Sequence, residues 1–98
     1  MATSKPTLRV ELTPELKAAI RRLPKGRRKQ IGEVVTAVRD GFGVPHLHSG
    51  LGIRRLRDSL FECRVGLTLR LAFDAETGVL SFSDIGTHDQ IRKLIRNR

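Results

Sequence analysis

Two arginines and a histidine are the residues of this chain whose types and spacing suggest chemistry on a phosphate. Arg64 and Arg70 lie in a segment of alternating apolar and polar residues, and His88 follows a second such segment. This alternation predicts antiparallel strands with one buried face. Two guanidinium groups on a rigid sheet match phosphate oxygens, and an imidazole can carry a proton near neutral pH. The spacing therefore predicts a candidate phosphate site with an acid–base group beside it.

A β-hairpin is expected to place the two arginines directly opposite each other. The register that joins apolar side chains pairs Phe61 with Phe73, Cys63 with Leu71 and Val65 with Leu69. Arg64 then faces Arg70 across a loop at residues 66–68, and Glu62 lies diagonal to Arg70. Like charges in this position are destabilising. Either a bound anion compensates for them, or Glu62 neutralises a solvated face on which the charge pairs are worth little.

A further strand, expected at residues 79–85, extends this row of polar residues. With a loop at residues 75–78, the expected pairs are Phe73 with Leu80, Leu71 with Phe82 and Arg70 with Ser83. Thr87 and Gln90 form a capping box, which predicts that the last helix begins there. His88 would then lie in the first helical turn, beside the end of the row Arg64, Arg70 and Ser83. Backbone N–H groups at that end also favour an anion.

The chain is short and strongly basic. Its 98 residues predict one domain over residues 1–98. Nineteen Lys and Arg against ten Asp and Glu give a net charge of +9, which predicts a polyanionic partner, either nucleic acid or an acidic protein. The single cysteine, Cys63, is interpreted as a small buried hydrophobic residue and fits a reducing cytoplasm. No signal peptide or transmembrane segment is recognisable, so no membrane partner is expected.

The remaining segments predict the elements that position these residues. They are a strand at residues 7–12, a helix capped by Thr13 and Pro14, a helix from about Arg28 to Phe42, a loop at residues 44–52, a strand near residues 53–57 and a C-terminal helix. The predicted fold class is α+β with the order β-α-α-β-β-β-α. A curled antiparallel sheet would carry the helical hairpin on one face and the arginines on its open face.

Several of these segments together resemble a known family. The run LRDSLFECRVG at residues 56–66 is similar to the pattern L-x-x-x-L-[YF]-E-x-R-V-G of RelE/ParE toxins of type II toxin–antitoxin systems. Residues 70–73, RLAF, resemble the R-L-x-[FY] strand that follows it, and residues 86–89, GTHD, resemble the G-[TS]-H-[SD] ending of the YafQ-like branch. The order of elements agrees along the whole chain. The resemblance implies a small RelE-like fold.

The resemblance also implies an activity, which is cleavage of messenger RNA in the ribosomal A site. The ribose 2′-oxygen attacks the adjacent phosphate, with no metal or other cofactor. By match, Arg64 and Arg70 would hold the scissile phosphate, and His88 would be the general acid or base. Glu62, His46 and His48 are secondary candidates for catalysis. The implied partners are the ribosome, messenger RNA and a cognate acidic antitoxin.

Other basic residues are candidates for RNA contacts, and an equally good interpretation is that they are solvent-exposed surface charges. They are Arg54, Arg55, Arg57, Arg92 and Lys93. Where many relatives carry an aromatic residue after the last histidine, this chain has Arg92, which can stack on a base. His46 and His48 form a His-x-His pair, but nothing completes a metal site, so no metal is expected.

Two other functions stay open at this point. One is a ParE-like inhibitor of DNA gyrase that performs no RNA chemistry. The other is a degenerate RNA-binding member of the same fold, which would show salt-sensitive binding without cleavage.

Overall fold

A five-stranded sheet with helices on both of its faces forms the structure, which is a computed structural model describing residues 8–96. The elements in chain order are β1 (Arg9–Leu12), α1 (Pro14–Arg21), α2 (Lys25–Gly41), α3 (Pro45–Leu51), β2 (Arg54–Arg57), β3 (Leu60–Val65), β4 (Leu69–Glu76), β5 (Val79–Thr87) and α4 (His88–Arg96). The predicted α+β class is confirmed, and β2 lies where a strand near residues 53–57 was predicted, whereas α3 adds a helix to the predicted order. The start of the first predicted strand at Thr7 lies outside the described residues. Within residues 8–96, no helix is long and apolar enough to span a membrane.

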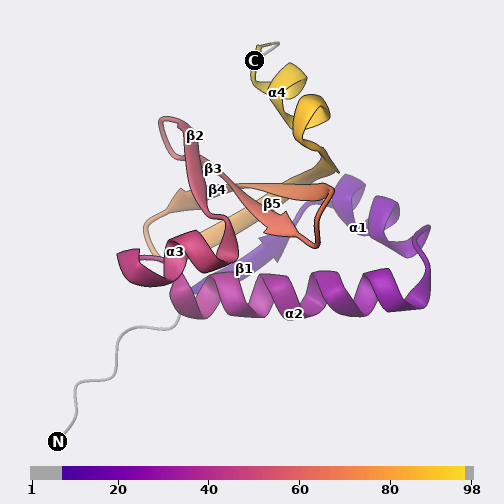
Figure 1. The fold of residues 1–98 in the computed structure, drawn as a ribbon, viewed down its shortest axis with the longest axis horizontal. Helices are drawn as coiled ribbons and strands as arrows, with labels where there is room; N and C mark the ends of the chain where they lie inside the picture. The colour runs from indigo at the N-terminus through magenta and orange to yellow at the C-terminus, as the bar shows by residue number, and fades with distance from the viewer. Residues whose placement is uncertain (1–7, 97–98) are drawn as a thin grey trace, which may run out of the picture.

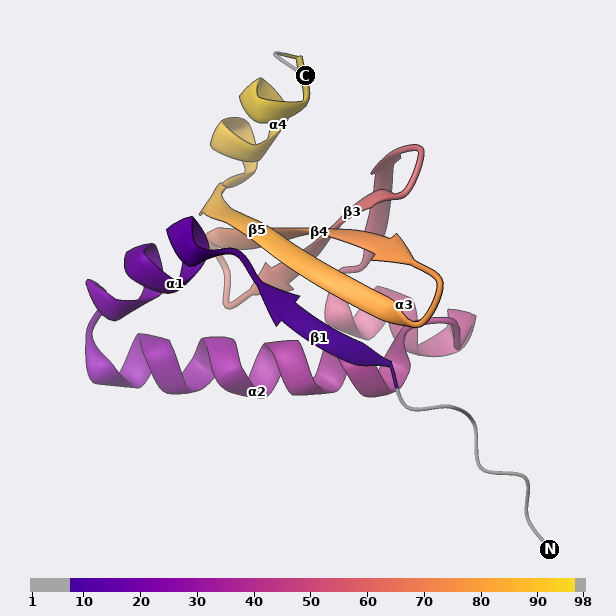
Figure 2. The same ribbon diagram turned by 180° about the vertical axis from the view of Figure 1, so that it is seen from behind.

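The strands lie in the order β1-β5-β4-β3-β2, and β1 runs parallel to β5 while the other neighbours are antiparallel. Figures 1 and 2 show α2 lying along one face of the sheet with α1 beside it, while α4 rises on the opposite side. The helical hairpin therefore covers one face, as predicted.

The main core lies between the α1–α2 hairpin and the sheet. Its buried members are Leu16, Ile31, Val38, Ile53, Cys63, Val65, Leu71, Phe73, Leu80 and Phe82. The first helix begins where the sequence predicts, because the Thr13 hydroxyl accepts the Leu16 N–H at 3.2 Å and Pro14 takes the first helical position. The alternation of β3 and β4 buries most of the predicted apolar set, with Phe61 and Leu69 half-buried, and leaves the arginines on the other face.

Two helical predictions are wrong. The second helix begins at Lys25 rather than near Arg28, because Pro24 takes the extended cap position in front of it. Residues 45–51 form α3 where a loop was predicted. Pro45 starts this helix at its first position, where no N–H donor is needed, and Gly52 ends it in the left-handed conformation with φ 66°.

The predicted register between the last two strands is also wrong. Glu76 pairs with Val79, so the turn holds only Thr77 and Gly78, and an irregularity between Ala72 and Phe73 then shifts the register once more. Arg70 therefore lies opposite Gly86, and Ser83 instead donates its hydroxyl to Asp84 at 2.8 Å. The predicted row of Arg64, Arg70 and Ser83 does not form.

The second face of the sheet is only partly open. Ile91 of α4 is 1% exposed and packs on Leu60 and Ala72, with Leu56 and Ile95 beside them. The prediction of an open face is therefore wrong at the end of the sheet that α4 covers. This second apolar cluster fixes α4, and with it His88, against the arginine-bearing face.

Candidate functional site

Arg64 and Arg70 are opposite each other across β3 and β4, as the apolar pattern predicts. Each guanidinium has a partner within the protein. Arg64 Nη2 donates to the Ser49 carbonyl oxygen at the end of α3 (3.2 Å), and Arg70 Nε lies 3.7 Å from Glu62 Oε2. Arg70 Nη1 also donates to the carbonyl of Leu69 at 3.2 Å. The like charges are therefore compensated internally, and a bound anion is not needed to explain them.

The end of α3 lies in close contact with Arg64. A Cβ atom placed on Gly52 would lie 2.7 Å from Arg64 Cβ and 3.0 Å from its Nε. Only glycine fits this approach, and its positive φ adds a second reason for the residue. Gly52 and Ser49 together fix where the Arg64 side chain runs.

A small cavity of about 180 Å³ lies over this pair. It is lined by Gly52, Arg54, Glu62, Arg64 and Arg70. Three guanidinium groups around so small a space can bind one compact anionic group such as a phosphate.

Glu62 is the buried charge of the site, with 1% of its surface exposed. It lies directly opposite Arg54 of β2 and diagonal to Arg70. Its Oε1 has no hydrogen-bond partner. The interpretation of Glu62 as part of a solvated face is therefore wrong, because β2 and α4 enclose it.

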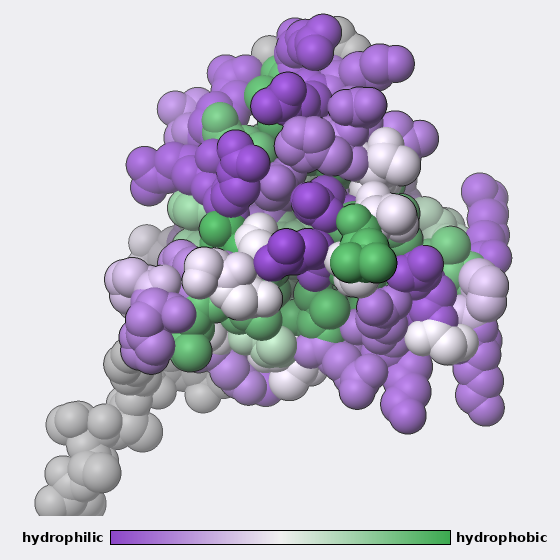
Figure 3. All heavy atoms as spheres, viewed as in Figure 1, coloured by the Kyte–Doolittle hydropathy of each residue, from purple (hydrophilic) through white to green (hydrophobic). Residues whose placement is uncertain are grey.

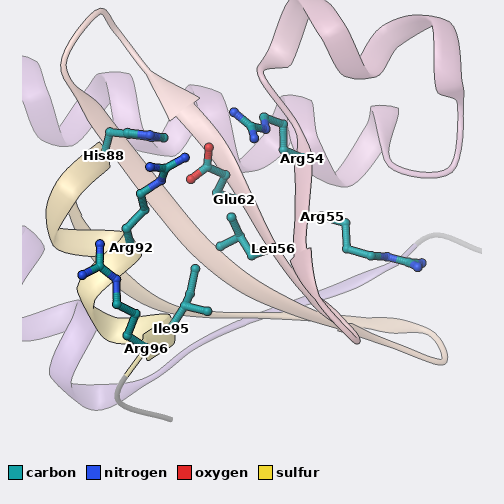
Figure 4. A pocket seen from close by; sticks show the side chains of 8 residues that line it. All are labelled: Arg54, Arg55, Leu56, Glu62, His88, Arg92, Ile95 and Arg96. Carbon is teal, nitrogen blue, oxygen red and sulfur yellow. The ribbon is translucent and has the colours of Figure 1, made fainter.

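A larger cavity of about 310 Å³ lies on the other side of Glu62. It is lined by Arg54, Arg55, Leu56, Glu62, His88, Arg92, Ile95 and Arg96. Figure 4 shows the guanidinium groups of Arg54 and Arg92 on either side of the Glu62 carboxylate, with the His88 ring beside Arg92. The Nδ1 atom of His88 is buried and has no hydrogen-bond partner. Hydrophilic side chains cover the surface over α4 and β2 (Figure 3).

The predicted catalytic trio is divided between these two cavities. Arg64 and Arg70 line the small cavity, whereas His88 lines the large one. Arg54 and Glu62 line both and so lie between them. The site is thus bipartite, and the two residues at its junction were predicted only as an RNA contact and a secondary candidate.

Only some of the predicted RNA-contacting residues line a cavity. Arg54, Arg55 and Arg92 line the large cavity, although the guanidinium of Arg55 lies 5.4 Å from the centre of the Phe61 ring and points away from the cavity (Figure 4). Arg57 and Lys93 line neither cavity. Arg57 instead donates to the Ile95 carbonyl oxygen at 3.5 Å.

Sequence reasoning missed Arg96, Leu56 and Ile95 as cavity residues. A signal for Arg96 was present, because His88, Arg92 and Arg96 recur at intervals of four along α4 and so share one helical face. Leu56 and Ile95 gave no such signal, since their meeting depends on how α4 docks on the sheet.

The other two histidines and the cysteine lie away from the cavities. His48 Nε2 accepts the Gly43 N–H at 3.0 Å, and its ring stacks on Phe42 with centroids 5.6 Å apart. His46 is exposed on α3. Burial raises the pKa of the Cys63 thiol to about 12, so this residue is a packing group, as predicted. Among residues 8–96, no group of three or more His, Cys, Asp and Glu side chains could hold a metal ion.

Comparison with known proteins identifies the fold. No family model and no curated protein matches the sequence. Similar solved structures include the archaeal RelE–RelB complex from Pyrococcus horikoshii OT3, with 17% identity and a TM-score of 0.69 over 83% of this chain and 94% of that one. The RelB–RelE antitoxin–toxin complex from Methanococcus jannaschii has 14% identity and a TM-score of 0.63, over 84% of this chain and 94% of that one. YafQ from E. coli strain BL21(DE3) has 14% identity and a TM-score of 0.59, over 86% of this chain and 97% of that one. The chain therefore has the RelE-like fold that its motifs predicted.

Proposed function

We propose that this protein is the toxin of a type II toxin–antitoxin system and that it cleaves messenger RNA on the ribosome without a metal ion. The observation that carries the proposal is the pair of neighbouring cavities. Arginines from β2, β3, β4 and α4 line them, and Glu62 and His88 supply buried polar atoms without partners. The proposal is supported by the RelE-like fold, which similar structures show in complexes with RelB.

The chemistry needs no group beyond those of the chain and the RNA. The ribose 2′-oxygen attacks the adjacent phosphorus, and the bond from phosphorus to the 5′-oxygen breaks. This leaves a 2′,3′-cyclic phosphate and a free 5′-hydroxyl. Arg54, Arg64 and Arg70 stabilise the charge that develops on the phosphoryl oxygens. His88 acts as general base for the 2′-hydroxyl proton or as general acid for the leaving 5′-oxygen, and water takes up or supplies the other proton.

The partner that controls such a toxin would be an acidic antitoxin. The chain carries a net charge of +9, and an acidic segment laid over the cavity arginines would neutralise them and exclude RNA. A cytoplasmic location follows from the same proposal, since ribosome and message are found there.

Mapping the 5′ ends of messages after a short pulse of expression tests the proposal. The wild type should produce new ends and stop growth, and His88→Ala and Arg70→Ala should do neither while remaining folded. If both variants remain fully toxic, the assigned site is wrong. Intact messages together with a DNA-damage response would instead indicate inhibition of gyrase.

A further inference from the structure

We propose that the larger cavity binds a nucleobase and that the free oxygen of Glu62 selects bases with an exocyclic amino group. Adenine, cytosine and guanine carry such a group, and uracil does not. This inference rests on the proposed function only in taking RNA as the substrate. It assigns Glu62 to specificity rather than to the chemical step.

The lining of the cavity suits a base. Leu56 and Ile95 provide apolar surface, and the planar guanidinium of Arg92 can stack on an aromatic ring. Its volume of about 310 Å³ is sufficient for a small ligand. The adjoining small cavity, with Arg64 and Arg70, can hold a neighbouring phosphate while the base lies in the large one.

Glu62 presents an acceptor that the protein itself does not use. A buried polar atom without a hydrogen-bond partner is unfavourable. Although Arg54 lies directly opposite and Arg92 lies on the other side of the carboxylate (Figure 4), neither satisfies Oε1. Arg70 reaches only the other oxygen, at 3.7 Å. Since an ionised carboxylate can only accept hydrogen bonds, its partner must be an N–H or O–H donor from outside.

The identity of that donor decides whether the cavity discriminates between bases. Amino groups on the base edges of adenine, cytosine and guanine can donate to Glu62, whereas the corresponding atom of uracil is a carbonyl oxygen that would be left facing a carboxylate. A site built around a hydrogen bond to the exocyclic position rejects ligands that lack a donor at that position. A ribose hydroxyl is common to all four nucleotides, so a bond from Glu62 to ribose would give no preference.

Two pairs of mononucleotides test the inference by NMR titration of the purified full-length chain. GMP is compared with IMP, which lacks only the amino group, and CMP is compared with UMP. In each pair the amino-bearing nucleotide should bind more tightly by about fivefold or more. In Glu62→Gln the preference should shrink to within about twofold, because the neutral amide is a weaker acceptor and can also donate to a carbonyl.

Glu76→Gln is the matched control, because it removes the same charge from an exposed position outside both cavities. It should leave both preferences as they are in the wild type. Equal binding within each pair by the wild type, or an unchanged preference in Glu62→Gln, overturns the inference.

The titrations need neither ribosome nor cleavage, so they separate this inference from the proposed function. A protein that prefers GMP to IMP but cleaves no message retains the base site and loses the nuclease assignment. A protein that cleaves messages but binds each pair equally retains the nuclease and loses the base site. In cells, cuts by the wild type should share an amino-bearing base at one fixed position, and Glu62→Gln should admit uracil there.

Discussion

Replacing Gly52 with alanine should displace the Arg64 side chain while the protein remains folded. Its effect on cleavage can then be measured apart from its effect on stability. Gly52 ends α3 with φ 66°, and an added Cβ would lie 2.7 Å from Arg64 Cβ and 3.3 Å from its backbone nitrogen. These atoms belong to the start of the side chain and to the strand itself, so rotation of a flexible end cannot relieve the clash. Either the end of α3 or β3 has to move, and the hydrogen bond from Arg64 to Ser49 is lost.

Gly78 supplies the control for backbone strain. Its φ is 78°, and nothing lies within 4 Å of an added Cβ. Gly78→Ala should therefore show only the cost of a left-handed alanine, about 1–2 kcal/mol. Gly52→Ala should show that cost plus overpacking of about 1–3 kcal/mol. Both variants should remain folded if the parent has the usual stability of about 5–15 kcal/mol.

Urea unfolding and message cleavage, measured on the same preparations, separate the two effects. Cleavage per folded molecule should be unchanged in Gly78→Ala. It should fall by about 10- to 100-fold in Gly52→Ala, the loss expected for one charged contact to the phosphate. Arg64→Ala, which adds no clash, should show a similar loss of cleavage. Undiminished cleavage by folded Gly52→Ala and Arg64→Ala would refute the assignment of Arg64 to the phosphate.

Three further predictions concern the cap of α4, the contact of His48 with Gly43, and the buried cysteine. Thr87→Ala should lower the free energy of unfolding by about 1 kcal/mol in urea, because it removes the side-chain cap of α4, and an unchanged midpoint would contradict this. His48→Ala should cost about 1 kcal/mol through loss of the bond to Gly43, with cleavage per folded molecule unchanged; a specific loss of cleavage would restore it as a catalytic candidate. Because the folded-state pKa of Cys63 is raised from 9.0 to about 12, the folded state binds the thiol proton more tightly, and stability should fall as pH rises above about 9. Iodoacetamide should accordingly label Cys63 at pH 8 only in denaturant, and rapid labelling of the native chain would argue against its burial.

The hairpin of β3 and β4 was predictable residue by residue. Shifting its register by one position would turn Arg70 into the core, so the sequence admits only one pairing. The cap of α4 was equally predictable, because Thr87 N–H donates to Gln90 Oε1 and Gln90 N–H donates to Thr87 Oγ1, as a capping box requires. Local hydrogen bonds and strict alternation are properties that a single sequence expresses directly.

The register of β4 and β5 and the presence of α3 were not predictable in the same way. A turn of two residues and a bulge near Ser83 each displace the pairing, and the apolar alternation tolerates several such combinations. Pro45 can end one helix or begin the next, and the sequence alone does not show that it begins α3. The burial of Glu62 depends on α4 docking on the sheet, a tertiary event with no local signature.

Internal partners hold the opposed guanidinium groups of Arg64 and Arg70 in position without a ligand. Arg64 is held by the carbonyl of Ser49 and Arg70 by the carboxylate of Glu62, so neither guanidinium depends on an anion for its position. A phosphate entering the small cavity has to compete with these internal partners, and binding of free phosphate should therefore be weak. If RNA is the substrate, as proposed above, the same partners reduce the ordering needed when it binds, because the guanidinium groups are already oriented. Weak binding of the isolated anion and strong stabilisation of a charge that develops during reaction are thus compatible, since only interactions that strengthen in the transition state raise the rate.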